Sequence, residues 1–155
     1  MKRVNRVLLA LSIVALAAAP AALAGATPPV AHAATTPTVK SAHTSLGKIL
    51  VTGSGSTLFM FTRDHHNTDA CVRINGCSAV WPVLKANGKL SAGGGLASSR
   101  LSTIRLRNGT RQVTYDGHPL YTYSFSSGPR DTSYVGARQF GGSWYALSVA
   151  GHAVK

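Results

Sequence analysis

Short runs in which apolar and polar residues alternate fill the chain from about residue 46 onward, and Gly, Asn and Ser punctuate them. No window of a dozen residues shows a 3.6-residue apolar stripe, and glutamate is absent. This pattern predicts short antiparallel strands joined by tight turns. We expect a hairpin of two strands at 48–51 and 57–62, and further strands at 103–107, 112–115, 119–125 and 144–149. A short helical turn is predicted at 77–80 or at 96–101.

An eight-residue sequence segment occurs in two similar copies. Residues 55–62 read Gly-Ser-Thr-Leu-Phe-Met-Phe-Thr, and residues 117–124 read Gly-His-Pro-Leu-Tyr-Thr-Tyr-Ser. A tryptophan follows each copy, and the offset is 62 residues for the glycines and 63 for the tryptophans. A constant offset between two landmarks indicates duplication of a structural unit. We therefore expect an all-β fold in which two related β units, about 46–86 and 100–150, pack as one compact domain over residues 46–150.

The N-terminal segment predicts export. Three basic residues open the chain, and a 13-residue apolar run follows that is too short and too rich in Ala to span a membrane comfortably. Small-x-small cleavage motifs end at Ala24 and Ala33. We favour a signal peptide of residues 1–33, with cleavage after Ala24 as the alternative. A flexible leader rich in Thr, Ala and Pro is expected at 34–45. The mature protein is thus expected to be extracellular, either released or associated with the cell wall.

Basic residues dominate the charge of the chain. It has sixteen Lys and Arg against four acidic residues, and a formal net charge of +12. Cleavage after Ala33 removes three basic residues and leaves +9. Such an excess outside the cell favours an anionic cell-wall polymer or a membrane surface as partner, without specific nucleic-acid recognition. The alternative is that the charge only maintains solubility, and the oligomeric state stays open. The densest basic group comprises Arg100, Arg105, Arg107 and Arg111.

The two cysteines, Cys71 and Cys77, predict a disulfide, because an exported chain with one pair of cysteines normally oxidises it. The bridge closes a small loop, for which chain entropy gives a stabilisation of ~2 kcal/mol. Five residues separate the cysteines, whereas thioredoxin-like motifs have two. A structural bridge is therefore favoured over a redox role.

The segment around Asp64, His65 and His66 is the densest group of potential metal ligands, and it precedes Cys71. Carboxylate and imidazole groups could hold zinc or copper. Adjacent histidines point in different directions in an extended chain, however, and the spacing matches no established metal signature. We expect a polar loop without a metal or cofactor. The alternative function is an extracytoplasmic metal-binding or redox-associated protein.

Recognised catalytic motifs are missing from the sequence. There is no nucleophile elbow, phosphate loop or zinc-hydrolase pattern, and four acidic residues make a glycosidase pair improbable. A weaker alternative assembles a site from Asp116, His118, Tyr121 and Asp131. We expect a non-catalytic protein that binds or interacts at the cell envelope.

Ordered segments of both halves together resemble a known family. In the first half, Gly55-x-Thr57-Leu58-Phe59-x-Phe61-x-x-Asp64 precedes Trp81-Pro82, and in the second, Gly117-His118-Pro119-Leu120-Tyr121-x-Tyr123 precedes Asp131 and Trp144. Over about residues 46–149 this resembles the bacterial "secreted repeat of unknown function", also described as predicted lipoproteins with a Yx(FWY)xxD motif. The resemblance implies an envelope protein without an assigned activity. Here Phe59 and Ser126 replace the tyrosine and aspartate of the motif, and a lipid-attachment cysteine is missing.

The repeated aromatic residues allow two interpretations. Phe59 and Phe61, like Tyr121 and Tyr123, are two positions apart and would share one face of a strand. They could form flat platforms for a sugar ring, or they could form a duplicated core. We favour the core for these four residues and for the two tryptophans, because aromatic side chains bury large apolar areas.

Overall fold

The computed structural model describes residues 38–155. The predicted signal peptide and both of its cleavage motifs lie outside these residues. The described part is built mainly from short antiparallel strands, which confirms the all-β prediction. No helix within residues 38–155 has the length and hydropathy that a bilayer span requires.

The first hairpin corrects the sequence analysis. Strand β1 (Val39–Thr44) pairs antiparallel with β2 (Gly47–Thr52), so half of the segment assigned to a flexible leader at 34–45 is a strand. Its sequence shows no apolar alternation, because only Val39 is fully buried. The ladder to β2 and the backbone bonds of Val39 with Ser91 and Gly93 hold it instead.

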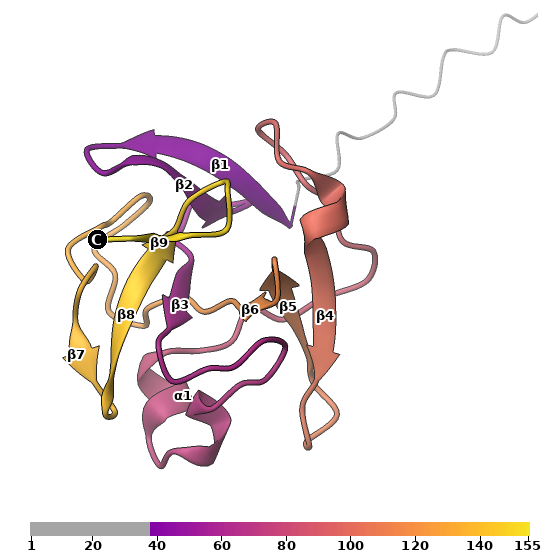
Figure 1. The fold of residues 1–155 in the computed structure, drawn as a ribbon, viewed down its shortest axis with the longest axis vertical. Coiled ribbons are helices and arrows are strands. Elements are labelled where there is room, and N and C mark those ends of the chain that lie inside the picture. Colours follow the sequence, from indigo (N-terminus) through magenta and orange to yellow (C-terminus); the bar gives the residue numbers. More distant parts are fainter. Residues whose placement is uncertain (1–37) are drawn as a thin grey trace, which may run out of the picture. The chain divides into compact units, whose positions relative to one another are not determined.

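The hairpin predicted for 48–51 and 57–62 is present only near its turn, where Val51 pairs with Thr57 and the Leu58 N–H donates to the Leu50 carbonyl. Strand β3 (Phe59–Phe61) itself does not pair with β2. It pairs antiparallel with β8 (Gly142–Leu147) from the other half of the chain. β8 also pairs with the two-residue strands β7 (Arg138–Gln139) and β9 (Ala153–Val154). Figure 1 shows β3 and β8 side by side.

The second half contains the predicted hairpin. β4 (Leu101–Arg105) pairs with β5 (Arg111–Tyr115), which pairs with β6 (His118–Pro119). The strand predicted at 119–125 is shorter than expected, because the regular ladder ends at Pro119 and only Tyr121 makes further bridges.

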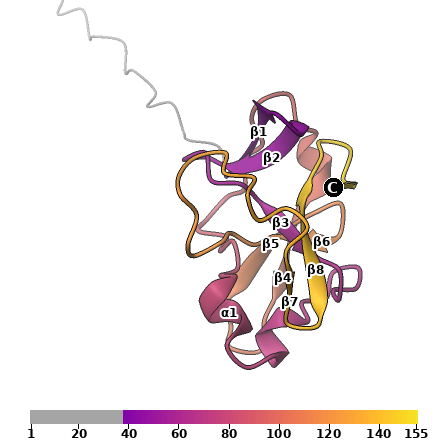
Figure 2. The ribbon, with the colours of Figure 1, turned by 90° about the vertical axis from the view of Figure 1, so that its left-hand side faces the viewer.

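Helical structure is limited to single turns. The predicted turn at 77–80 is α1 (Cys77–Val80), preceded by the 3₁₀ turn η1 (Cys71–Arg73). A second 3₁₀ turn, η2 (Ser98–Arg100), falls within the other predicted range. Cys71 and Cys77 form the predicted disulfide between η1 and α1. Figure 2 shows α1 at the end of the described domain opposite the β1–β2 hairpin.

The two repeat units interlock at equivalent residues. The Phe59 N–H donates to the Tyr121 carbonyl at 2.9 Å, and the Tyr121 N–H donates to the Phe59 carbonyl at 3.0 Å. Phe59 also pairs with Ala146, and Tyr121 pairs correspondingly with Val83. A local twofold relation between the repeats therefore passes between Phe59 and Tyr121, and each unit completes the sheet of the other.

The core divides into an aliphatic and an aromatic part. Leucine and valine side chains, with Tyr115, fill the part beneath the two hairpins. Phe59, Phe61, Trp81, Tyr121 and Trp144 fill the part beside the disulfide. Since burial of apolar area is the main stabilising force, neither repeat could expose its share of this surface and remain folded alone.

Candidate functional site

Most aromatic positions of the family motif lie in the core. Phe59, Phe61, Tyr121, Trp81 and Trp144 are at most 2% exposed. The structure therefore supports the core interpretation for these residues and removes them as surface platforms. Pro82, Pro119 and Leu120 also belong to this packed region, Pro119 and Leu120 being buried and Pro82 half-buried.

The indole rings of Trp81 and Trp144 stack on one another, with centroids 4.0 Å apart and an interplanar angle of 2°. Each indole also contacts an aromatic ring of the other repeat. Phe61 stacks on Trp144 with centroids 4.2 Å apart and an interplanar angle of 12°, whereas Tyr123 lies 4.6 Å from Trp81 and is tilted by 44°. Tyr123, unlike Phe61, is only half-buried, and it forms the outer end of the stack.

A buried hydrogen bond connects the two copies of the motif. The Tyr121 hydroxyl donates to Oδ2 of Asp64 at 3.0 Å, so the tyrosine of the second copy meets the aspartate of the first. At the equivalent position across the twofold relation the chain has Phe59 and Ser126. Phenylalanine has no hydroxyl to donate, and serine has no carboxylate to accept it. The bond between Tyr121 and Asp64 therefore has no counterpart between Phe59 and Ser126.

The carboxyl group of Asp64 is protonated more readily than an ordinary aspartate. Burial, as the main cause, and the neighbouring Asp69 together raise its pKa to about 7. Hydrogen bonds from the Ala70 N–H, at 2.8 Å, and from Tyr121 oppose this rise. Burial and the same carboxylates raise the pKa of the Tyr121 phenol, which therefore stays protonated as the donor.

Asp131, the aspartate of the second half, organises its own loop. Its Oδ1 accepts from the Ser133 N–H, and its Oδ2 accepts from the N–H and hydroxyl of Ser127. These backbone hydrogen bonds hold its pKa well below the usual range. The carboxylate is therefore a structural acceptor and does not lie with Asp64.

The turn at Gly117 and His118 contacts the loop of the first repeat. The imidazole of His66 lies against Gly117, where an added Cβ would clash with it, and Gly117 has a φ of +78°. Burial lowers the pKa of His118, and the charge of Asp116 opposes this effect. Both features make this turn a packed junction between the repeats.

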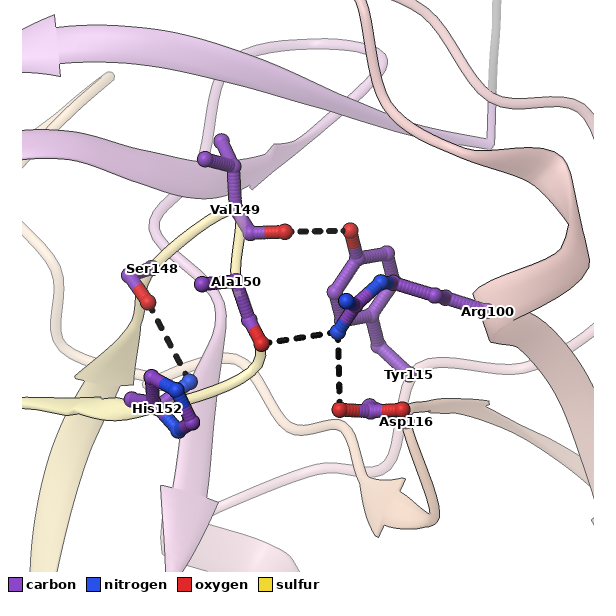
Figure 3. Close-up of polar contacts among 7 residues, drawn as sticks. All are labelled: Arg100, Tyr115, Asp116, Ser148, Val149, Ala150 and His152. Atoms are coloured by element: carbon purple, nitrogen blue, oxygen red, sulfur yellow. Dashed lines mark hydrogen bonds and ion pairs between the residues drawn. The ribbon is translucent and has the colours of Figure 1, made fainter.

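Arg100 and Tyr115 fasten the loop at 148–152 to the second hairpin (Figure 3). The Arg100 guanidinium pairs with Asp116 at 2.8 Å and donates to the Ala150 carbonyl at 2.7 Å. The Tyr115 hydroxyl donates to the Val149 carbonyl at 2.7 Å. Of the four residues considered as an alternative site, Asp116 thus pairs with Arg100, Tyr121 bonds Asp64, and Asp131 is bonded within its own loop. Asp116 and His118 are the two whose charges interact.

The loop at 64–68 is a turn, in which the backbone groups of His65 and Thr68 bond to each other. Asp64 points to Tyr121, whereas His65 and His66 are exposed. Among the residues that the structure describes, no group of three or more His, Cys, Asp or Glu side chains could hold a metal ion.

A cleft of about 430 Å³ lies between the segment at 67–73 and the tip of the β4–β5 hairpin. Arg73, Arg105 and Arg107 line it, together with apolar and polar side chains of the same two segments. We call this site the arginine cleft. The basic group identified from the sequence is divided by the fold, because Arg100 pairs with Asp116 and Arg111 bonds the Thr103 hydroxyl. Arg73 was missed, since it lies some thirty residues earlier in the sequence.

The pairing of the strands and the aromatic core define a two-repeat all-β protein with one disulfide. The family model described as "secreted repeat of unknown function" matches residues 40–85 and 102–148. The chain therefore belongs to this family of secreted proteins, which confirms the resemblance seen in the sequence. Comparisons with curated proteins and with solved structures give no match.

Proposed function

We propose that this secreted protein binds an anionic polymer of the cell envelope at the arginine cleft. The observation that carries the proposal is the convergence of three exposed arginines, Arg73, Arg105 and Arg107, from two distant segments on one cleft. Guanidinium groups bind phosphate and carboxylate in bidentate geometry and stay charged at every physiological pH. A polymer with regularly repeated anionic groups can engage several of them at once.

The carboxylates of the described residues form no ion pair with the three cleft arginines. Asp116 pairs with Arg100, and no cleft arginine forms an ion pair within residues 38–155. Asp131 is occupied by its own loop, and Asp64, with a pKa of about 7, is only partly ionised at neutral pH. Asp69 lines the cleft but is buried and accepts a backbone N–H. The net attraction of the cleft for anions is therefore high.

The other side chains of the cleft favour a polymer with an aliphatic or sugar backbone. Val72, Ile104 and Leu106 supply apolar surface between the charged groups, and Val72 is 41% exposed. No aromatic ring lines the cleft, so it lacks the stacking surfaces with which proteins hold the bases of single-stranded nucleic acids. A polyol phosphate or an acidic glycan thus fits the site better than a nucleic acid.

Binding of the mature protein to poly(glycerol phosphate) at several NaCl concentrations tests the proposal. We expect binding at low salt that weakens steeply as salt rises, because the contacts are ionic and exposed. The double variant Arg105→Gln and Arg107→Gln should lose affinity by about tenfold or more, since charge-assisted hydrogen bonds are the strong ones. The matched control is Arg130→Gln with Arg138→Gln, which removes the same charge from exposed residues outside the cleft.

Equal loss in both double variants would show that diffuse charge, rather than the cleft, attracts the polymer. Absence of binding at low salt would refute the proposal. Binding to phosphatidylglycerol vesicles without binding to the polymer would also refute it, in favour of a membrane surface.

A further inference from the structure

Three aromatic rings form a second surface, which we call the aromatic face. Phe125 is 66% exposed, and its ring meets Tyr123 edge-to-face at 5.6 Å. Tyr123 also lies 3.8 Å from Tyr134, and both tyrosines are half-buried. Soluble proteins seldom leave clustered large aromatic side chains in water unless the cluster contacts a ligand or partner. The aromatic face includes no residue of the arginine cleft.

The aromatic face exists because the repeats differ at one pair of equivalent positions. In the first repeat Phe61 is fully buried, and it packs so closely on Gly142 that an added Cβ would lie 2.6 Å from its ring. In the second repeat the equivalent Tyr123 lies against Trp81 at 4.6 Å but is tilted by 44°, and it remains half-exposed. The outer surface of this stack is therefore covered in one repeat and open in the other.

Hydrogen bonds fix the loop that presents the aromatic face. Ser124 donates through its N–H to the Val80 carbonyl at 3.0 Å and through its hydroxyl to the Ala79 carbonyl at 2.7 Å. Further along the loop, the Asp131 carboxylate accepts hydrogen bonds from Ser127 and Ser133. A ligand that stacks on a preformed surface loses less affinity to the ordering of side chains. The exposed position of Phe125 is thus held by the fold around it.

We propose that the aromatic face binds a neutral sugar ring of an envelope glycan. A pyranose ring has an apolar face that stacks on an aromatic ring and hydroxyl groups at its edge. The phenol groups of Tyr123 and Tyr134 supply donors and acceptors around the stacking surface. The Gln139 carboxamide accepts from the Trp81 indole at 2.8 Å, which leaves its NH₂ group as a donor beside the stack. Apolar surface with a few fixed polar groups is the usual composition of a small-ligand site.

Charge and size argue against other occupants. A cation would be attracted by the rings alone, because the nearby Asp131 carboxylate is used by its own loop. The high positive charge of the protein repels cations. Three side chains cover far less than the ~800 Å² that each partner buries in a stable protein interface. A single sugar ring matches the aromatic face in both size and charge.

Saturation-transfer NMR of the mature protein with chitotetraose and cellotetraose tests the proposal. We expect transfer to the ring protons on the apolar face of at least one sugar, and a change in Trp81 emission because Tyr123 contacts that indole. Phe125→Ala should weaken binding about tenfold. Leu46→Ala is the matched control, because Leu46 is also an exposed large apolar residue and lies in the turn between β1 and β2.

The outcomes separate this proposal from the arginine cleft. Neutral sugar binding should persist at high salt and in the Arg105→Gln and Arg107→Gln variant. No transfer to either sugar at millimolar concentration would overturn the proposal. Binding of tetramethylammonium that Phe125→Ala abolishes would overturn it in favour of a cation site. Self-association that the same variant abolishes, measured by sedimentation, would overturn it in favour of a protein interface.

Discussion

The Tyr121 hydroxyl bonds the Asp64 carboxyl across the boundary between the two repeats, at 3.0 Å. Both groups are largely removed from water, so this hydrogen bond replaces the hydrogen bonds to water that each group loses on folding. At the equivalent position Phe59 is buried in the aromatic core, and the Ser126 hydroxyl donates to the Gly128 carbonyl. The two repeats thus share an interlocking backbone but differ in the side-chain hydrogen bond at these equivalent positions.

The pKa of Asp64 predicts a stability that decreases as pH rises. An unfolded aspartate ionises near 3.8, whereas in the fold this carboxyl ionises near 7. Between these values the folded protein retains a proton that the unfolded chain has released, so the free energy of unfolding falls as pH rises from about 4 to about 7. The contribution is fully present only below pH 3.8. Asp64→Asn should remove the decline and stabilise the protein at pH 8 by on the order of 2 kcal/mol, allowing for partial exposure.

Urea unfolding of Asp64→Asn and of the parent protein at pH 5 and pH 8 measures this effect. The lowered pKa of His118 has the opposite effect on stability. Just below pH 6.5 the unfolded chain holds a proton on this histidine that the folded protein has released, so the free energy of unfolding rises with pH there. The difference between variant and parent at each pH cancels that contribution. A constant difference across the range would contradict the assignment to Asp64.

Tyr121→Phe should cost ~1–3 kcal/mol, because it leaves a buried carboxyl oxygen of Asp64 without its donor. In an Asp64→Asn background, Tyr121→Phe should cost less at pH 8 than it does in the parent protein, because a neutral amide oxygen loses less than a carboxylate when the donor is removed. Thermal unfolding of the four proteins forms the cycle. Strict additivity would mean that the two side chains do not interact.

The disulfide should stabilise the segment from η1 to α1 by ~2 kcal/mol, since it closes a short loop. Cys71→Ala with Cys77→Ala should reduce the urea midpoint accordingly, with an additional loss from the cavities because both side chains are fully buried. The fold should nevertheless form, because the repeats interlock elsewhere. A double variant that shows no cooperative unfolding transition would contradict this expectation.

Removal of the Arg100 contacts should affect local order more than global stability. Its ion pair with Asp116 is exposed, and such pairs contribute under ~1 kcal/mol. Arg100→Met should therefore change the free energy of unfolding little, while amide exchange at 148–152 accelerates because the Ala150 carbonyl loses its donor. Lys48→Met, which removes an exposed cation from β2, provides the control. Unchanged exchange in that loop would contradict the role of Arg100 as its fastener.

Sequence alone was sufficient for features that depend on local pattern. Turn residues and alternation located β4, β5 and β8 to within a few residues, and the repeated segment indicated duplication. Long-range pairing could not be read this way. The sequence of β1 has almost no apolar pattern, because backbone hydrogen bonds to β2 hold this strand. β3 pairs with β8, which lies more than eighty residues away in the sequence.

The candidate sites show the same limit. Arg73 comes close to Arg105 and Arg107 only in the folded protein. The exposed Phe125 indicates a binding surface only once the structure shows that Phe61 is buried, whereas its counterpart Tyr123 is partly exposed. Spacing indicated that aromatic residues share a face. It could not indicate which of them the other repeat covers, because that depends on packing between distant segments.

The two stacked tryptophans provide a matched test of a single hydrogen bond. The Trp81 indole N–H donates to Gln139, whereas the buried Trp144 indole N–H has no partner within residues 38–155. Each replacement by phenylalanine creates a similar cavity, but only Trp81→Phe also removes a hydrogen bond, and Trp144→Phe removes an unsatisfied donor. Trp81→Phe should therefore be the more destabilising of the two by ~1–3 kcal/mol in urea unfolding. An equal or larger loss for Trp144→Phe would show that cavity shape, rather than hydrogen bonding, distinguishes these equivalent positions.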